Sequence, residues 1–364
     1  MKKLSFLLAA IPLQIFSQQI DLTRAPNSYI FNLPKAVQEK QGGLYIPVEK
    51  AYAVWESYEY LQDGVTNAIP SGVQSAQIIW EDVPGLISSV DIILNATPSL
   101  AKIKVNVNKG LGKGNAVVAY KVNEEVYWSW HVWVTDDPTD GVVYSQGFEK
   151  DLTGKRFDPQ YMDRNLGAVS NHFLGDDWHK SGGLMYQWGR KDPFPGLVYK
   201  DLNFYSINSH LGELSHKSVS GESIPVMTRP FPDIKKNIPY SVKNPLTYII
   251  NSDKGNWFSD KMHKVSGTDF VVWDLWGDNT RGNNSNASSS NAALKNDSQS
   301  YELKSPMDPC PSGWRVPSYY GRVTTNNNLG PWGKKASWIN DDTNGNAIIS
   351  QTVENSSLNG VKVY

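Results

Sequence analysis

Apolar and polar residues alternate in short runs between residues 27 and 134, and the runs recur about every ten residues. Glycine, proline or asparagine separates most of these runs. Short alternating runs with turn residues between them are typical of an antiparallel β-sandwich. The pattern therefore predicts strands at residues 27–33, 44–48, 52–57, 76–82, 86–94, 102–107, 114–121 and 126–134.

The last of these predicted strands, 126–134, is rich in aromatic residues. Because side chains alternate along a strand, Trp128 lies on one face, whereas His131 and Trp133 lie on the other. We expect the first face to line the core and His131 to point away from its deepest part. A polar run of turn residues at 136–141 follows, and it marks the predicted domain boundary.

After this boundary the strand-like runs become shorter, and glycine, asparagine, tryptophan and proline crowd the sequence between them. No amphipathic helix longer than about three turns stands out. The chain therefore divides into a sandwich at 18–140 and a loop-rich unit at 141–364. Residues 358–364 read as a turn that enters a strand. Two explanations stay open for this ending: a second unit truncated at its C-terminus, and a final edge strand.

The first seventeen residues have the three-part pattern of a secretory signal peptide. Lys2 and Lys3 precede a mainly apolar run at 4–16, and Ser17 provides a small residue at the cleavage site. The run is too short to span a membrane, and no other apolar stretch is long enough. No cysteine lies near Ser17, so we do not expect a lipid anchor there. The sequence predicts a protein that is secreted or held at the cell surface.

Charge and cysteine content narrow the partners further. The chain has 35 lysines and arginines against 36 aspartates and glutamates. Such a balance does not provide the broad basic surface of a nucleic-acid-binding protein. The single cysteine, Cys310, excludes a disulfide within the chain, so packing must stabilise the fold. Composition does not decide the oligomeric state.

Sequence motifs of common hydrolases and metalloproteases are absent, so we expect a protein without catalytic activity. Adjacent acidic pairs such as Asp176 and Asp177 are typical of turns, whereas a glycosidase needs two carboxyl groups facing each other across a cleft. Asp274, Asp278 and Asn279 bring together the oxygen ligands that calcium prefers. Their spacing matches no known calcium loop, and a plain turn is the alternative. No other cofactor is expected.

The strongest compositional signal is the content of 13 tryptophans, several of which lie beside glycine, aspartate, asparagine or lysine in the second unit. An exposed indole can stack on the apolar face of a sugar ring while neighbouring polar groups bond its hydroxyls. The alternative is that these tryptophans are buried core residues. The candidates for ligand contact are Trp178, Trp188, Trp257, Trp273 and Trp276.

Four strings also occur together: WSWHVWVTD at 128–136, YMDRNLGA at 161–168, YQWGRKDPFP at 186–195 and DPCPSGWRVPS at 308–318. With these strings the chain resembles the Fibrobacter succinogenes major paralogous domain, which occurs in secreted and surface proteins of the Bacteroidetes. The resemblance implies a C-type-lectin-like α+β fold for the second unit, preceded by an immunoglobulin-like sandwich. The Glu-Pro-Asn triplet of calcium-dependent lectins is missing.

These observations lead to the hypothesis of a secreted or cell-surface binding and adhesion protein. It would contact glycans or a surface protein through the tryptophan-rich loops of its second unit. A structural component of a surface filament or envelope complex, joined through strand addition, is the second hypothesis. A glycan-acting enzyme is the third.

Overall fold

The computed structural model describes residues 21–61, 68–139, 142–143, 149–150, 156–157, 160–172, 180–194, 226–227, 234–249, 257, 274–277, 304–316, 329–330 and 333–334. The predicted signal peptide and the terminal 358–364 segment lie outside these residues. The described part is rich in sheet, with few helices, and most of its regular structure precedes residue 136. None of the helices described has the length and apolar character needed to cross a membrane.

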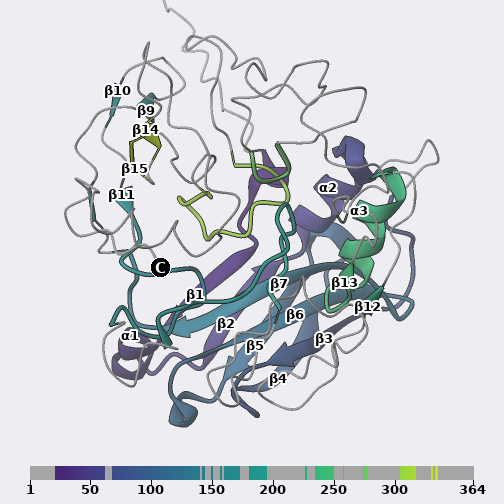
Figure 1. Ribbon diagram of the computed structural model, residues 1–364. Coiled ribbons are helices and arrows are strands. Elements are labelled where there is room, and N and C mark those ends of the chain that lie inside the picture. Colours follow the sequence, from purple (N-terminus) through teal and green to yellow (C-terminus); the bar gives the residue numbers. More distant parts are fainter. Residues whose placement is uncertain are drawn as a thin grey trace, which may run out of the picture.

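The two larger sheets, of four and three strands, lie next to each other in the lower half of Figure 1. Neighbouring strands are antiparallel, except that β1 runs parallel to β7. The first sheet has the order β1 (Ser28–Asn32), β7 (Glu125–Thr135), β6 (Gly114–Val122), β3 (Gln74–Glu81). The second has the order β2 (Gly43–Pro47), β5 (Lys102–Val107), β4 (Ile87–Ile93).

The alternation along the strands accounts for the core between the sheets. On β5, Ile103 and Val105 are buried, whereas Lys102 is exposed. On β7, Trp128 and Trp130 belong to the same hydrophobic cluster. Large aromatic side chains remove much apolar surface from water, so this cluster supplies a main part of the stabilisation.

Seven of the eight predicted strands are confirmed to within two residues, but the strand predicted at 52–57 is wrong. That segment belongs to helix α2 (Glu49–Ser57). Ala51, Val54 and Trp55 are buried, and their spacing of three and four residues places them on one helical face. The helical period of the apolar residues therefore overrides the strand preference of the aromatic and β-branched residues.

His131 lies on the face of β7 opposite the hydrophobic cluster, as expected, but it is only 1% exposed because this second face is buried as well. The second face of β7 is covered by segments 160–172, 180–194 and 304–316. The indole nitrogen of Trp133, for example, donates to the carbonyl of Ala168 at 3.2 Å. Residues on both sides of 136–141 therefore share one buried layer, and the division at this run stays a prediction.

Residues at the start of β1 also contact the late segment 304–316. The side-chain amide of Asn27, just before β1, donates to the carbonyls of Pro306 at 2.8 Å and Asp308 at 2.6 Å. The hydroxyl of Ser28 lies 2.5 Å from the carbonyl oxygen of Pro309. The first strand is thus held by a segment about 280 residues later in the chain.

The remaining elements are short. Two further α-helices are α1 (Leu33–Gln38) and α3 (Ile234–Lys243). Single turns of 3-10 helix are η1 (Leu22–Arg24), η2 (Glu59–Leu61), η3 (Pro98–Leu100), η4 (Lys109–Leu111) and η6 (Asp274–Trp276). Two-residue strands pair as β8 (Val142–Val143) with β11 (Gln160–Tyr161), β9 (Glu149–Lys150) with β10 (Arg156–Phe157), β12 (Val226–Met227) with β13 (Tyr248–Ile249), and β14 (Leu329–Gly330) with β15 (Gly333–Lys334).

Candidate functional site

Trp188 lies at the tip of a tight turn and is 40% exposed. The turn closes with a hydrogen bond from the Arg190 amide to the Gln187 carbonyl, at 2.9 Å. Gly189 has a φ of +85°, which favours glycine, and a Cβ there would lie 2.6 Å from a methyl carbon of Leu275. The sequence Gln-Trp-Gly-Arg therefore presents one tryptophan at the surface on a turn that accepts only glycine beside it.

Trp276 packs beside Trp188, with ring centroids 6.1 Å apart and ring planes at 54°. Its half-buried indole donates a hydrogen bond to the carbonyl of Arg190 at 2.9 Å. Tyr186 stands edge-on against Trp276, with centroids 6.5 Å apart. We call these two indoles the Trp188–Trp276 pair.

Trp257, the third described candidate, is buried and holds the backbone of Trp188. It is only 6% exposed, and its indole donates to the carbonyl of Trp188 at 2.5 Å. Trp178 and Trp273 lie outside the described residues. Of the calcium candidates, Asp278 and Asn279 also lie outside them, and Asp274 is described only through its backbone in η6. Within the part of the chain that is described, no three His, Cys, Asp or Glu side chains gather into a metal site.

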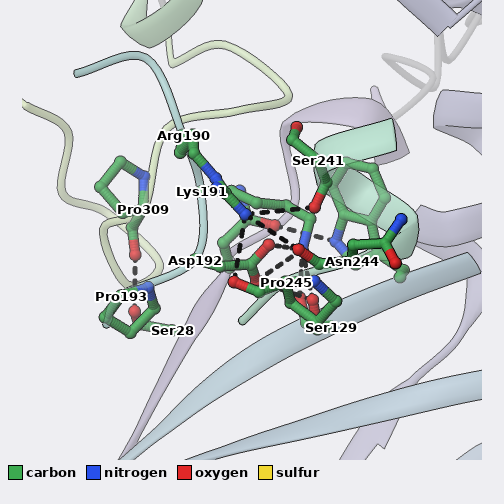
Figure 2. Close-up of polar contacts among 12 residues, drawn as sticks. Ser28, Ser129, Arg190, Lys191, Asp192, Pro193, Ser241, Asn244, Pro245 and Pro309 are labelled. Atoms are coloured by element: carbon green, nitrogen blue, oxygen red, sulfur yellow. Dashed lines mark hydrogen bonds and ion pairs between the residues drawn. The ribbon is translucent and has the colours of Figure 1, made fainter. Parts of the chain in front are cut away.

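Arg190 fixes the base of the turn. Its guanidinium is fully buried and donates to four carbonyls at the end of α3 and just beyond it (Figure 2). The acceptors are Thr247 at 2.5 Å, Pro245 at 3.1 Å, Asn244 at 3.2 Å and Ser241 at 3.3 Å. The C-terminal carbonyls of a helix favour a cation. Burial lowers the pKa of Arg190 to about 10, so the group remains charged at neutral pH.

Gln187 ties the same turn to β13. Its side-chain nitrogen donates to the carbonyl of Ile249 at 2.7 Å, and its oxygen accepts from the amide of Ile249 at 3.1 Å. The amide side chain thus pairs with the backbone as a neighbouring strand would. Gln187 and Arg190 together connect the turn beneath Trp188 to residues 241–249.

Lys191 and Asp192 form a buried ion pair on the outer face of β7 (Figure 2). The ammonium lies 2.7 and 2.8 Å from the two carboxylate oxygens and 2.6 Å from the hydroxyl of Ser129. It also lies 4.5 Å from the ring centroid of Trp128. Burial lowers the pKa of Lys191 to about 8, against the opposing effect of Asp192. Both side chains are almost completely shielded from solvent, so this pair is a structural polar contact inside the protein.

A second polar line crosses the same face of the sheet. The Nδ1 atom of His131 lies 3.0 Å from the hydroxyl of Ser28, and its Nε2 atom lies 2.9 Å from the side-chain oxygen of Asn115. Asn115 donates in turn to Asp82 at 2.7 Å and to the carbonyl of Gly167 at 3.0 Å. A nucleophile, a histidine and an orienting polar residue occur in this order in hydrolase triads, but here the serine, histidine and asparagine are at most 2% exposed. Burial lowers the pKa of His131 to about 3.

Asp308, at the start of the described segment 308–316, also forms a buried anchor. The carboxylate of Asp308 is inaccessible and accepts from the amides of Cys310 and Val316, each at 2.8 Å. Lys304 donates to it at 2.8 Å. Burial raises the pKa of the Cys310 thiol well above its usual range, so the nucleophilic thiolate is suppressed.

The sequence indicated the aromatic residues of this segment, but it did not indicate that the charged residues that follow them are buried. The charged residues are Arg190, Lys191 and Asp192. The structure adds that all three are at most 2% exposed. The sequence feature that could have indicated this burial is the apolar pair Pro193 and Phe194, which follows the triplet directly.

The segment 186–194 therefore has an exposed aromatic tip and a buried charged base, and it joins the sheet to α3. The accessible chemistry at its tip is the face of an indole. Comparison with known proteins adds no relative: no protein-family model, curated protein or solved structure matches the chain.

Proposed function

We propose that the protein is a non-catalytic binding and adhesion protein, secreted or held at the cell surface, which contacts glycans through the Trp188–Trp276 pair. The observation that carries this proposal is the position of Trp188. Among the described residues it is the only tryptophan with an exposed side chain. Exposed tryptophans held by neighbouring residues are typical anchors of binding surfaces.

The backbone at Trp188 and Arg190 is held in place before any ligand binds, and this preorganisation supports the proposal. The carbonyls of Trp188 and Arg190 each accept a hydrogen bond from another indole, that of Trp257 and Trp276 respectively. A ring that is already fixed loses little conformational entropy when a ligand arrives. An indole face of this kind suits the apolar C–H face of a sugar ring.

The burial of the nucleophile-like groups supports a non-catalytic role. Ser28 with His131, and Ser129 with Lys191, have the contacts that an activated hydroxyl would need. A substrate must reach such a hydroxyl, yet both serines are at most 1% exposed. These contacts explain how the outer layer is held on the sheet.

The strand order supports an immunoglobulin-like assignment for residues 18–140. One sheet contains β7, β6 and β3, and the other contains β2, β5 and β4. This matches the division of an immunoglobulin constant domain into its GFC and BED strands. The C-type-lectin-like fold proposed for residues 141–364 rests on the four sequence strings alone.

The test is a glycan array probed with the wild-type chain and with Trp188→Ala and Trp276→Ala. We expect a confined set of glycans to bind, and each substitution to weaken binding at least about tenfold. Tyr45→Ala is the matched control, because Tyr45 is 55% exposed on β2, outside the aromatic cluster. Binding that survives both tryptophan substitutions contradicts the proposed site. Loss of binding in EDTA supports calcium at Asp274, Asp278 and Asn279.

One observation favours the second function, an assembly component. Apolar side chains gather at the connection between β4 and β5, where Ile93, Leu94 and Leu100 are 44%, 64% and 45% exposed. Exposed apolar clusters of this kind commonly serve as contacts between proteins. Light scattering after size-exclusion chromatography tests this alternative. Assembly requires an oligomer that Ile93→Glu dissociates, and a wild-type monomer at all concentrations counts against it.

A further inference from the structure

The angle between the two indoles restricts the form of glycan that the site accepts. This step rests on the proposed function and adds the class of ligand. The ring planes of Trp188 and Trp276 differ by 54°, and their centroids are 6.1 Å apart. The two rings are therefore neighbours that face in different directions.

The surrounding contacts restrain the Trp276 ring and the backbone of Trp188. Trp276 cannot turn freely, because its indole N–H is bonded to the carbonyl of Arg190 and Tyr186 stands against its ring at 81°. The backbone of Trp188 is held by Trp257 and by the closed turn at 187–190. Rotation of Trp276 into the plane of Trp188 would break its hydrogen bond and leave the indole N–H without this acceptor.

A flat polysaccharide surface, as in a crystalline fibre, can lie against two aromatic rings at once only if the rings are coplanar. Two planes at 54° do not meet this condition. A single glycan chain can meet it, because rotation about the glycosidic bond turns one sugar ring relative to the next. Each indole then stacks on one of two adjacent sugars.

We infer that the Trp188–Trp276 pair binds two adjacent sugar rings of a soluble, single glycan chain, and that it does not bind crystalline polysaccharide surfaces. Both rings contribute, so a disaccharide binds more tightly than the corresponding monosaccharide. Trp188 is the more exposed ring and makes the larger contribution.

The experiment compares two forms of the same polysaccharides. Calorimetry measures binding of the full chain to soluble oligosaccharides of cellulose, chitin, xylan and mannan, from the monosaccharide upward. Sedimentation measures retention on microcrystalline cellulose and crystalline chitin. Both use the wild type, Trp188→Ala, Trp276→Ala and the control Tyr45→Ala. Circular dichroism and thermal melting verify that each variant is folded, and Trp276→Phe replaces Trp276→Ala if the latter is not.

We expect binding to soluble chains, at least about tenfold loss in either tryptophan variant, and no retention on crystals. Retention on crystals that Trp188→Ala abolishes overturns this inference but leaves the proposed function standing. Equal affinity for a monosaccharide and its disaccharide overturns it as well. A folded wild type that binds neither soluble nor crystalline glycans overturns the proposed function, and the inference falls with it.

Discussion

The indole N–H of Trp257 donates a hydrogen bond to the backbone carbonyl of Trp188, with 2.5 Å between nitrogen and oxygen. One tryptophan thus holds the peptide that carries another. The acceptor belongs to the exposed tip of the turn, whereas the donor ring is almost fully buried.

Substitution of Trp257 by Phe tests this support. The variant keeps an aromatic ring but loses the N–H donor, so the Trp188 peptide is held less firmly. We expect a loss of about 1–2 kcal/mol in the free energy of unfolding, measured in urea, and weaker glycan binding. Unchanged stability and unchanged affinity would show that the bond does not position Trp188.

Gly189 gives a sharper test of the turn because a matched glycine exists. Gly189→Ala introduces a left-handed alanine at a φ of +85° and a methyl group 2.6 Å from Leu275. Gly313→Ala introduces the same kind of strain at a φ of +78°, in a turn closed from the Trp314 amide to the Pro311 carbonyl, with nothing within 4 Å.

We expect Gly313→Ala to cost about 1 kcal/mol in unfolding free energy, and Gly189→Ala about 1–3 kcal/mol more through overpacking. Urea unfolding of both variants measures the difference. Equal losses would mean that the packing of Leu275 under the turn yields to the methyl group at no cost.

The buried pair of Lys191 and Asp192 is tested with a double-mutant cycle. Lys191→Met leaves the Asp192 carboxylate inside the protein without its cation, which costs about 3–5 kcal/mol. We expect Lys191→Met with Asp192→Asn to be more stable than Lys191→Met alone, because the second change removes the unpaired charge. Urea unfolding of the two single variants and the double variant measures the coupling energy. Additive losses would contradict the pairing.

Stability is expected to fall in acid through His131. The unfolded chain binds a proton at this residue near the ordinary pKa of 6.5, whereas burial lowers the pKa in the folded state to about 3. Below pH 6.5 the unfolded state therefore binds more protons. The contribution of neutral His131 is complete above this pH and is lost progressively as the pH falls towards 3.

Unfolding in urea at several pH values between 6.5 and 4.5 measures this effect, because carboxylates titrate mainly below that range. We expect a slope of up to about 1.4 kcal/mol per pH unit in the wild type. His131→Gln is expected to flatten it, since glutamine keeps hydrogen-bonding capacity and does not titrate. Parallel curves for the two proteins would exclude His131 as the group responsible.

The strands and their limits were predictable because they depend on local alternation. The wrong strand at 52–57 and the unforeseen burial of His131 have different causes. In the segment at 52–57, Val54 and Trp55 satisfy a helical period as well as a strand preference, and only packing decides between them. For His131 the strand was correct, but the residues that cover its face come from segments such as 304–316, far away in the sequence.

The candidate site was also predictable only in part. Exposed aromatic residues in turns can be proposed from composition and neighbours, and this selected Trp188 and Trp276 among others. Sequence neighbours cannot distinguish an indole at the surface from one beneath it, so Trp257 was grouped with them. The burial of Arg190 depends on carbonyls at the end of α3, which no local pattern places there.

The hydrogen bonds between residues 304–316 and the start of the first strand have a consequence for folding. Among the described residues, the side-chain amide of Asn27 donates only to carbonyls of residues 306 and 308, and the Ser28 hydroxyl also contacts the carbonyl of residue 309, so these contacts form only after nearly the whole described chain is available. Closing so long a loop is entropically expensive and favours slow, late completion. A chain that ended before residue 304 would leave the Asn27 amide without these acceptors, which makes the first strand and residues 304–316 fold as one cooperative unit.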